Sequence, residues 1–439
     1  MTTITKCDVA IIGGGISGTA LLYLLAKYTD LPHICLLEKY QDIAILNSHG
    51  RNNSQTLHCG DIETNYTLNK AIEVKAAADM VVNYLSKLPE RDQILHKYSK
   101  MVLGVGEQEC ELLRKRYLEF KPHFETLQLF EAHDIARLEP AVMQGRTEPV
   151  VGMGVENEYT AVDFHALAKS FVEQARLQNQ KQIDIKLGTK VKRIEKTADH
   201  FRVFTNKGLI EARFVVVSAG GHSLLYAQKM GYGMNYSCLP VAGSFYFTPN
   251  VLNGKVYTIQ NDVLPFAAIH GDPDVLVEGK TRFGPTALIL PMLERYNLKT
   301  VAEFFRVLRL DSKVMKVFWD LFKVADIRNY IFKNMLFEVP MIRRRLFLRD
   351  AKKIVPQMKL KDLTFAHKVG GIRPVMIDKE SCKLHLGEAK INPGNGIIFN
   401  MTPSPGATSC LGNARQDLLT IADYLQCSFD KQQLSSDLD

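Results

Sequence analysis

The feature that most constrains this chain is a glycine turn close to its N-terminus. An apolar run ends in the three glycines 13 to 15, and apolar residues return at helical spacing after Gly18. This pattern is typical of a buried strand, a tight turn and a helix. In such a unit Gly13 permits the turn, Gly15 lets a pyrophosphate approach the backbone, and Gly18 lets the helix pack close to the strand.

Two further features support a dinucleotide site at this turn. Ile16 and Ser17 open the helix, whose N-terminus is positioned to face phosphate groups. Glu38 follows Gly18 by twenty residues and closes a second apolar run. A carboxylate at that place can accept both hydroxyls of an adenosine ribose. We therefore predict that an adenine dinucleotide binds here.

Length and composition indicate an enzyme-sized protein of two joined domains. The chain has 439 residues and 46% hydrophobic residues, which suffices for more than one core. Its eight cysteines show no metal-type spacing, so we predict no metal site and a reducing, cytoplasmic compartment. The sequence begins without an apolar signal region, and no run of eighteen apolar residues predicts a membrane span.

The net charge of +8 is concentrated in one segment. Residues 295 to 353 contain fifteen Lys and Arg against six Asp and Glu, interleaved with Phe, Trp and Leu. Helices of this kind suit an anionic membrane surface. An ordinary solvated helix face over a buried stripe explains the pattern equally well. No nucleic-acid reader motif accompanies the charge, so we expect no nucleic-acid partner.

Along the chain, apolar strands of the first unit are interrupted and then resumed. Residues 183 to 221 add strands, a hairpin and the strand end Ser218 to Gly221, and residues 370 to 426 return once more. Residues 232 to 290 contain short strands broken by turns and predict an antiparallel sheet. A helical segment follows from about residue 292 to residue 360. The polar residues after Cys427 predict a frayed tail.

Several motifs together resemble the amino-acid-oxidase-type flavoprotein superfamily. They are the glycine turn with Glu38, the polar loop around Ser54, the strand end at Ser218 and the turn at Gly406. Within the superfamily the chain is similar to the malate:quinone oxidoreductase family of epsilon-proteobacteria and, more distantly, to L-2-hydroxyglutarate dehydrogenase. The segments that carry this similarity are Ser54 to Gly60, Leu264 to His270, Arg282 to Pro285, Gly371 to Pro374, and Asn400 to Thr408.

The resemblance implies an α/β fold in which a split Rossmann-type FAD-binding domain joins an antiparallel-sheet (α+β) substrate domain with added helices. We assign residues 1–75, 150–230 and 365–427 to the FAD-binding domain, 76–149 and 231–364 to the substrate domain, and 428–439 to the tail. The choice of FAD over NAD rests on the two returns of the chain, since NAD sites are usually completed within one continuous domain.

FAD is expected to be held noncovalently by residues spread over the whole chain. The expected contacts are Gly13, Gly15, Ile16, Ser17, Gly18, Glu38, Ser54, Gln55, Thr56, Val191, Ala219, Gly220, Gly371, Arg373, Gly406, Ala407 and Thr408.

The implied reaction is oxidation of (S)-malate to oxaloacetate, which needs a base for the hydroxyl proton and cations for the carboxylates. Histidine suits the first role at neutral pH, and arginine suits the second. His270 or His58 is the expected base, and the resemblance favours His270. Arg373 is expected to bind the C1 carboxylate, with Arg282 a candidate for the distal one.

The resemblance also implies a membrane quinone as electron acceptor and a peripheral place on the cytoplasmic face of the inner membrane. Three alternatives remain open. One is an L-2-hydroxyglutarate dehydrogenase or oxidase. Another is a different 2-hydroxy-acid, amine or amino-acid oxidase on the same fold. The third is a flavoprotein that binds FAD structurally, such as a tRNA-modifying or assembly factor.

Overall fold

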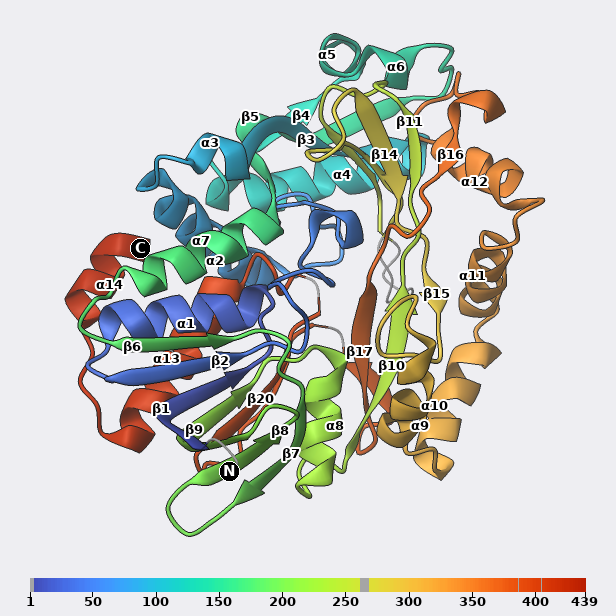
Figure 1. Cartoon of the computed structure of the whole chain (residues 1–439). Coiled ribbons are helices and arrows are strands. Elements are labelled where there is room, and N and C mark those ends of the chain that lie inside the picture. Colours follow the sequence, from blue (N-terminus) through green and yellow to red (C-terminus); the bar gives the residue numbers. More distant parts are fainter. Residues whose placement is uncertain (1–3, 261–267, 386, 404) are drawn as a thin grey trace.

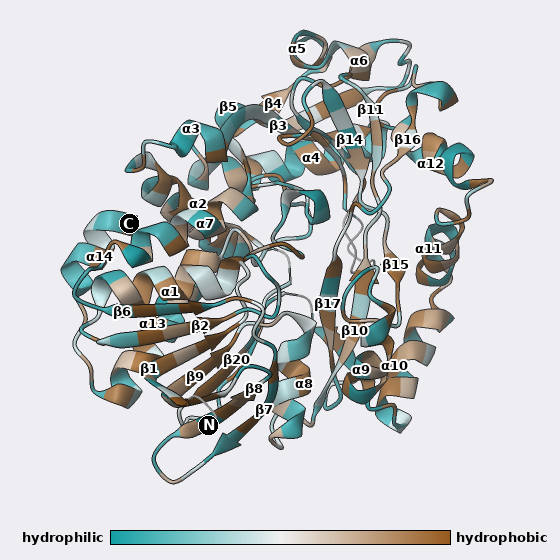
Figure 2. Ribbon diagram, viewed as in Figure 1, coloured by the Kyte–Doolittle hydropathy of each residue, from teal (hydrophilic) through white to brown (hydrophobic). Residues whose placement is uncertain are grey.

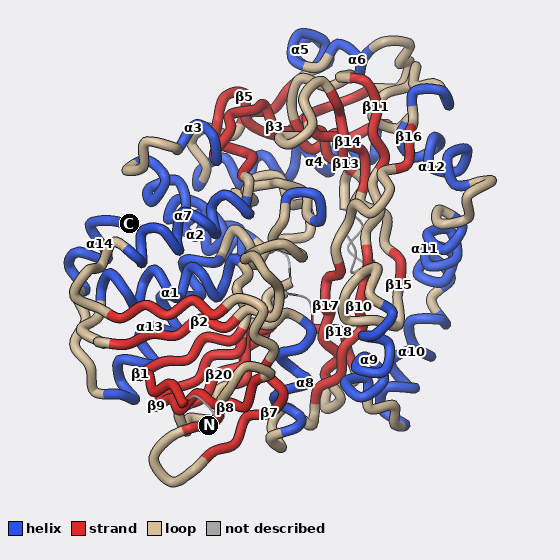
Figure 3. Tube along the Cα trace, viewed as in Figure 1, coloured by secondary structure: helices blue, strands red, loops and turns tan. Residues whose placement is uncertain are grey.

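The computed structural model describes residues 4–260, 268–385, 387–403 and 405–439. Within them the strands form three sheets, and helices cover the outer faces (Figure 1). Loops gather where the ends of the parallel sheet approach the other two sheets (Figure 3). Residues 264–267 and 404, which belong to the sequence motifs, lie outside the described ranges.

The first sheet has a parallel core with β1 between β2 and β9. Its strands are near-continuous apolar runs because both faces of the sheet are buried. The predicted hairpin before residue 213 is confirmed as the antiparallel pair β8 and β9. The strands are β1 (Ile4–Ile12), β2 (His33–Leu37), β6 (Gln182–Lys186), β7 (Val191–Lys196), β8 (Phe201–Thr205), β9 (Leu209–Val217), β19 (Ala389–Ile391) and β20 (Ile397–Met401).

Helices cover one face of this sheet, and the β7–β8 hairpin with one helix covers the other. Figure 2 shows the apolar strands of the sheet beneath amphipathic helices. The covering helices are α1 (Ile16–Tyr28), α2 (Leu68–Ser86), α7 (Phe164–Arg176), α13 (Cys410–Leu425) and α14 (Lys431–Leu438), and α8 (Gly221–Lys229) lies on the opposite face.

The frayed tail predicted after residue 427 is wrong. Residues 431–438 form α14, in which Leu434 and Leu438 are buried against the helical layer. The Asp437 carboxylate also forms ion pairs with Lys27 Nζ at 2.7 Å and with Lys87 Nζ at 2.6 Å. Two leucines four residues apart and one acid suffice to hold the tail, although its composition is polar.

The second sheet is mostly antiparallel and follows the order β16-β11-β14-β13-β12-β3-β5-β4. It packs between α4 on one face and α5, α6 and α12 on the other. Its strands are β3 (Leu95–Val105), β4 (Gln128–Phe130), β5 (Val150–Val162), β11 (Tyr246–Pro249), β12 (Lys255–Thr258), β13 (His270–Pro273), β14 (Lys280–Gly284) and β16 (Thr364–Phe365). The helices are α3 (Arg91–Ile94), α4 (Glu107–Phe120), α5 (Ala132–Leu138), α6 (Pro140–Met143) and α12 (Arg343–Ala351).

The third sheet is small and antiparallel, with the order β15-β10-β17-β18. Its strands are β10 (Tyr236–Ala242), β15 (Leu288–Ile289), β17 (Ile372–Asp378) and β18 (Lys383–His385). Helices α9 (Val301–Leu308), α10 (Ser312–Lys323) and α11 (Ala325–Leu336) follow the outer edge of the molecule beside it (Figure 1). In the described ranges no helix combines the length and the apolar character that crossing a membrane requires.

Two strands belong to other sheets than the domain boundaries predicted from the sequence imply. β5 begins at residue 150, where the FAD-binding part was expected to resume, but it pairs along its length with β3 in the second sheet. β17 follows residue 365, yet it pairs with β10 in the third sheet, with Val241 opposite Arg373. Such partners are more than 40 residues apart, and local periodicity carries no information about them.

Candidate functional site

A cavity of about 990 Å³ lies at the carboxyl ends of β1 and β2 and reaches the second and third sheets. The carboxyl end of a parallel sheet is the usual ligand position in open α/β folds. The volume is at the upper end for small-molecule sites, as an extended dinucleotide with a substrate beside it requires.

The glycine turn forms one wall of the cavity with closely packed backbone. Gly13 has φ +114°, and a Cβ there would lie 2.3 Å from the Ser218 carbonyl oxygen. A Cβ on Gly18 would lie 2.0 Å from the Gly13 carbonyl oxygen, so Gly18 sits behind the turn. A Cβ on Gly15 would meet only Ser48 Oγ, at 3.4 Å. The turn is therefore closed against the sheet and open towards the cavity at Gly15.

Glu38 stands at the end of β2 beside this turn. Its Oε2 accepts a hydrogen bond from the Gly14 amide at 2.7 Å, and its Oε1 accepts one from the Tyr40 amide at 2.9 Å. Burial raises the pKa of the carboxyl, although these two amide bonds act in the opposite direction. A carboxylate has about four acceptor positions, so Glu38 retains capacity for the hydroxyls of a ribose.

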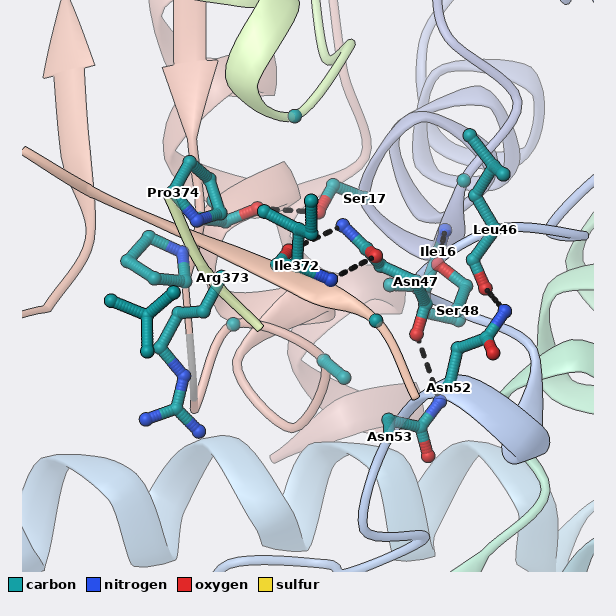
Figure 4. Close-up of a pocket in the computed structure, with 18 of the residues that line it drawn as sticks. Ile16, Ser17, Leu46, Asn47, Ser48, Asn52, Asn53, Ile372, Arg373 and Pro374 are labelled. Atoms are coloured by element: carbon teal, nitrogen blue, oxygen red, sulfur yellow. Dashed lines mark hydrogen bonds between the residues drawn. The ribbon is translucent and has the colours of Figure 1, made fainter. Parts of the chain in front are cut away.

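The polar loop after β2 is fixed to the start of β17 by side-chain amides. Asn47 Nδ2 donates to the Ile372 carbonyl at 2.8 Å, and Asn47 Oδ1 accepts from the Ile372 amide at 3.1 Å. Asn53 donates to the Asn47 carbonyl at 3.0 Å (Figure 4). The cofactor side of the cavity is thus joined directly to the strand that carries Arg373.

Most of the expected site residues line this one cavity, although they come from eight separate stretches of the chain. They are Gly13, Gly15, Ile16, Ser17, Glu38, Ser54, Thr56, His58, Val191, Ala219, Gly220, His270, Gly371, Arg373, Gly406 and Ala407. Gly18, Gln55, Arg282 and Thr408 do not line it.

Gln55 and Thr408 support the walls of the cavity. The Gln55 side chain donates to the Gly50 carbonyl at 3.2 Å and accepts from the Val275 amide at 3.1 Å. Thr408 Oγ1 accepts from the His58 amide at 3.1 Å. Both side chains are buried, and their hydrogen bonds hold loops together.

Arg282 is fully buried and belongs to the second sheet. Its Nη1 donates to the Gly50 carbonyl at 3.0 Å and lies 3.4 Å from Asp274 Oδ2. Its guanidinium also stacks on the Phe245 ring, 4.5 Å from the centroid. Because these groups enclose it, Arg282 does not reach the cavity and is not positioned to bind a substrate carboxylate.

Arg373 extends from β17 into the cavity. Figure 4 shows its side chain pointing away from the Asn47 cluster, with no dashed line at the guanidinium. Burial lowers the pKa of this guanidinium, and the neighbouring Tyr66 and Tyr330 phenols only partly oppose the effect. Among the described residues, no hydrogen bond or ion pair occupies its nitrogens. A partly desolvated cation favours binding of an anion, and a carboxylate fits the planar guanidinium in bidentate fashion.

His270 lies at the start of β13 with 3% of its surface exposed. Its Nδ1 is 2.6 Å from Asp272 Oδ2, and its ring stacks on Tyr257 at a centroid distance of 4.3 Å. Burial lowers the pKa of His270 more strongly than Asp272 raises it. The neutral imidazole is therefore favoured near neutral pH, and a neutral imidazole can accept a proton.

A second histidine and carboxylate pair lines the same cavity. His58 Nδ1 lies 2.7 Å from Glu63 Oε1. Burial would raise the pKa of Glu63, but His58 and the charge of Lys100 outweigh it and bring the pKa to about 2. Glu63 is consequently ionised, and Lys100 and His58 in the cavity wall stabilise its negative charge. The cavity thus contains two imidazoles that could exchange protons with a ligand.

Sequence reasoning missed the partners of these residues. Asp272 had a usable signal, because two residues separate it from His270 and residues i and i+2 lie on one face of a strand. Glu63, Tyr257 and Asn47 carried no local signal. Their roles follow from long-range pairing, such as the register of Tyr257 opposite His270.

Comparison with known proteins agrees with this architecture. A sequence model of the malate:quinone oxidoreductase family matches residues 5–419. A probable malate:quinone oxidoreductase from Campylobacter jejuni is 51% identical over 98% of both chains. The malate:quinone oxidoreductase of Helicobacter pylori is 46% identical over 98% of this chain and 97% of its own.

Solved structures share the fold at low sequence identity. L-α-glycerophosphate oxidase from Mycoplasma pneumoniae, solved with FAD bound, superposes with a TM-score of 0.66 at 18% identity over 97% of this chain and 96% of its own. Glycine oxidase from Geobacillus kaustophilus gives a TM-score of 0.65 at 17% identity over 98% of both chains. The fold is that of these oxidases, and by sequence the chain belongs to the malate:quinone oxidoreductase family.

Proposed function

We propose that this protein is an FAD-dependent malate:quinone oxidoreductase, which oxidises (S)-malate to oxaloacetate and passes two electrons to a quinone. Its family membership and the names of its relatives support the reaction. The observation that carries the proposal is the position of Arg373. Its half-buried guanidinium, to which no group among the described residues is hydrogen-bonded or ion-paired, lies in the same cavity as the dinucleotide turn and the neutral imidazole of His270.

The residues around the glycine turn, which form one wall of the cavity, fit FAD. The open side of Gly15 gives room for a pyrophosphate at the N-terminus of α1, and Glu38 offers acceptors for a ribose. Ala219, Gly220, Gly406 and Ala407 line the cavity further along and are proposed to contact the remainder of the cofactor. When bound, the flavin supplies the acceptor for the hydride that leaves the substrate C2.

Side chains of β13 and β17 are proposed to hold the substrate and to take its proton. Arg373 is proposed to bind the C1 carboxylate by paired N–H donors. Nε2 of His270 is proposed to take the hydroxyl proton while the C2 hydrogen leaves as hydride, so that the alcohol becomes a ketone. His270, which is neutral, thus transfers the proton, and Arg373, which is cationic, binds the carboxylate. The distal carboxylate must be bound by a group other than Arg282, which lies outside the cavity.

An anaerobic titration tests this function. The flavin absorbance of the holoenzyme is followed while (S)-malate, L-2-hydroxyglutarate, lactate, sarcosine or glycine is added. We expect malate to bleach the flavin at the lowest concentration and a quinone analogue to restore the absorbance. If 2-hydroxyglutarate or an amino acid bleached the flavin faster than malate, that compound would replace malate as the proposed substrate. The absence of bleaching by every compound would favour a structural role for FAD.

A peripheral place on the anionic cytoplasmic face of the inner membrane fits the helical segment that follows Arg295. Apolar side chains along α9 to α11 and the following loop face solvent, with Trp319 63% and Met341 89% exposed. The same segment holds the surplus of basic residues. Exposed apolar residues flanked by cations are typical of helices that lie in a bilayer interface, where a quinone is also found.

Vesicle sedimentation tests the membrane contact. We expect the protein to sediment with vesicles that contain phosphatidylglycerol and much less with phosphatidylcholine alone. The double variant Trp319→Ser/Met341→Ser should weaken binding by ~10-fold or more, since each apolar side chain withdrawn from lipid contributes about 1.5 kcal/mol or more. Leu118→Ser, which alters a leucine that is 72% exposed on α4, is the matched control. Equal losses in both variants would rule out this surface.

A further inference from the structure

Three neighbouring strands of the second sheet carry a buried row of charges beside His270. In the register of the sheet, Asp272 on β13 lies opposite Arg282 on β14. On the other side, Lys255 Nζ on β12 lies 3.4 Å from Asp272 Oδ1. All three side chains are fully buried. Burying ions is costly unless they are paired, and this row places one anion between two cations.

The row contacts the cavity through His270. His270 and Asp272 point to the same face of β13 because they are two residues apart, and Nδ1 lies 2.6 Å from Oδ2. Tyr257, opposite His270 in the register, covers the imidazole face and hydrogen-bonds Thr56 Oγ1 at 2.6 Å. The ring is therefore covered on one face by stacking and faces the carboxylate at Nδ1, in a close contact that lies outside hydrogen-bond geometry. Among the described residues no hydrogen bond occupies Nε2.

His270 and the two flanking cations together keep Asp272 ionised. Burial alone would raise the pKa of this carboxyl, but His270, Lys255 and Arg282 outweigh burial and bring it to about 2. An ionised carboxylate can only accept hydrogen bonds. An anionic oxygen 2.6 Å from Nδ1 repels a lone pair there and attracts a hydrogen, so the neutral imidazole carries its hydrogen on Nδ1 and its lone pair on Nε2.

We propose that Asp272 is a positioning residue for the oxidation, held as an anion by Lys255 and Arg282, and that it fixes His270 as the Nδ1–H tautomer with Nε2 free to accept the substrate proton. The inference rests on the proposed function, because it presumes that His270 is the base. It also gives Arg282 a role that differs from binding substrate. As the imidazole gains a proton, the anion of Asp272 stabilises the resulting cation without any rearrangement.

Nitrogen NMR of the holoenzyme tests the tautomer without any turnover. The protein is labelled with 15N-histidine, and the His270 signals are assigned from their loss in His270→Gln. We expect the shifts of Nδ1–H and of a bare Nε2 in the wild type. Asp272→Asn should shift the signals towards Nε2–H. A wild-type signal from Nε2–H, or an unchanged tautomer in Asp272→Asn, would overturn the proposal.

Kinetics then separate positioning from folding. The charged or titratable groups that face His270 are Asp272 on its own strand, Lys255 and Tyr257 on β12, and Arg282 on β14. Asp272→Asn should lower kcat/KM for malate by ~10²-fold, because the tautomer and the developing cation both lose support. In the pH profile of this variant, the acid limb is the range in which kcat/KM falls as His270 is protonated. This limb should move to lower pH, since the imidazolium loses its neighbouring anion.

Two matched variants complete the test. Asp272→Glu keeps the charge and should recover part of the rate. Asp274→Asn changes a buried acid two residues further on, which pairs with Arg282 and not with His270, and should leave the acid limb in place. An acid limb that does not move in Asp272→Asn would mean a purely structural role. If the wild type itself were not reduced by malate, the proposed function would fail, while the NMR result would still stand for the tautomer.

Discussion

The wall of the cavity that carries the glycine turn consists mainly of backbone groups, whereas the wall formed by β12, β13 and β17 presents side chains with polar groups, among them Tyr257, His270 and Arg373. In the first wall, Gly13 and Gly15 act by lacking a side chain. In the second, His270 and Arg373 act through the side chain itself. On the proposed function, this difference separates binding from chemistry: the first wall binds the dinucleotide, and the second supplies a base and a cation.

The strongest test of this division is His270→Gln. We expect kcat for malate to fall by ~10³-fold, because a positioned general base contributes on this order, while the protein retains its flavin. Stopped-flow measurement of flavin reduction gives the rate, and the absorbance ratio gives the flavin content. His58→Gln is the matched control, since His58 lines the same cavity with its own carboxylate partner. A larger loss in His58→Gln would transfer the role of base to that residue.

Arg373→Met is expected to have the next largest effect. Removing the paired N–H donors to a carboxylate costs about 3 kcal/mol, or ~10²-fold in kcat/KM. Arg373→Lys should recover only part of this loss, because an ammonium cannot form the planar paired contact. Steady-state kinetics with malate measure both variants. A loss of flavin without a change in the KM of the remaining holoenzyme would move Arg373 to the cofactor.

Two glycines of the first wall should separate folding from cofactor affinity. Gly15→Ala has room for a methyl group, so the apoprotein should fold with nearly the Tm of the wild type. The methyl occupies the place of closest approach, and we expect FAD binding to weaken by ~10-fold, about 1.4 kcal/mol. Gly13→Ala should instead lower Tm, since its φ of +114° and the 2.3 Å contact strain the native backbone. Fluorescence titration with FAD and thermal unfolding measure the two effects.

The smallest expected effect is on the pH profile of the wild type. The base must be neutral, so activity falls as pH drops through the pKa of His270. Because burial lowers this pKa, the acid limb of kcat/KM should lie below the ordinary histidine value of about 6.5. Measurement of kcat/KM from about pH 4.5 to about pH 8, a range that brackets the ordinary histidine pKa, locates the acid limb. A limb above 6.5 would mean that the charge of Asp272 outweighs burial.

The first wall was largely predictable from the sequence because its determinants are local. The spacing of Gly13, Gly15 and Gly18 followed by Glu38 fixes a strand, a turn, a helix and an acid within 26 residues. Each residue acts through its own backbone conformation or through a neighbour in the same unit. All four were expected to contact the cofactor; the structure places Gly13, Gly15 and Glu38 along the cavity and Gly18 behind the turn.

The second wall was predictable only in part. His270 and Arg373 were identified by the family resemblance, and both line the cavity. Arg282 was expected there too, but strand pairing places it against Asp274 and the Gly50 carbonyl. Its residue type suited a carboxylate ligand, and nothing local showed which way the side chain would point.

The sequence by itself determined that a dinucleotide unit begins this chain, that helices rich in basic residues follow residue 292, and to which family the chain is similar. Only the tertiary structure decided which charged side chains meet. β12, β13 and β14 bring Lys255, Asp272 and Arg282 into one buried row, and β17 joins the third sheet although the chain around it returns to the first. The physical reason is that backbone patterns repeat over a few residues, whereas the partner of a buried charge is chosen by strand register across the whole fold.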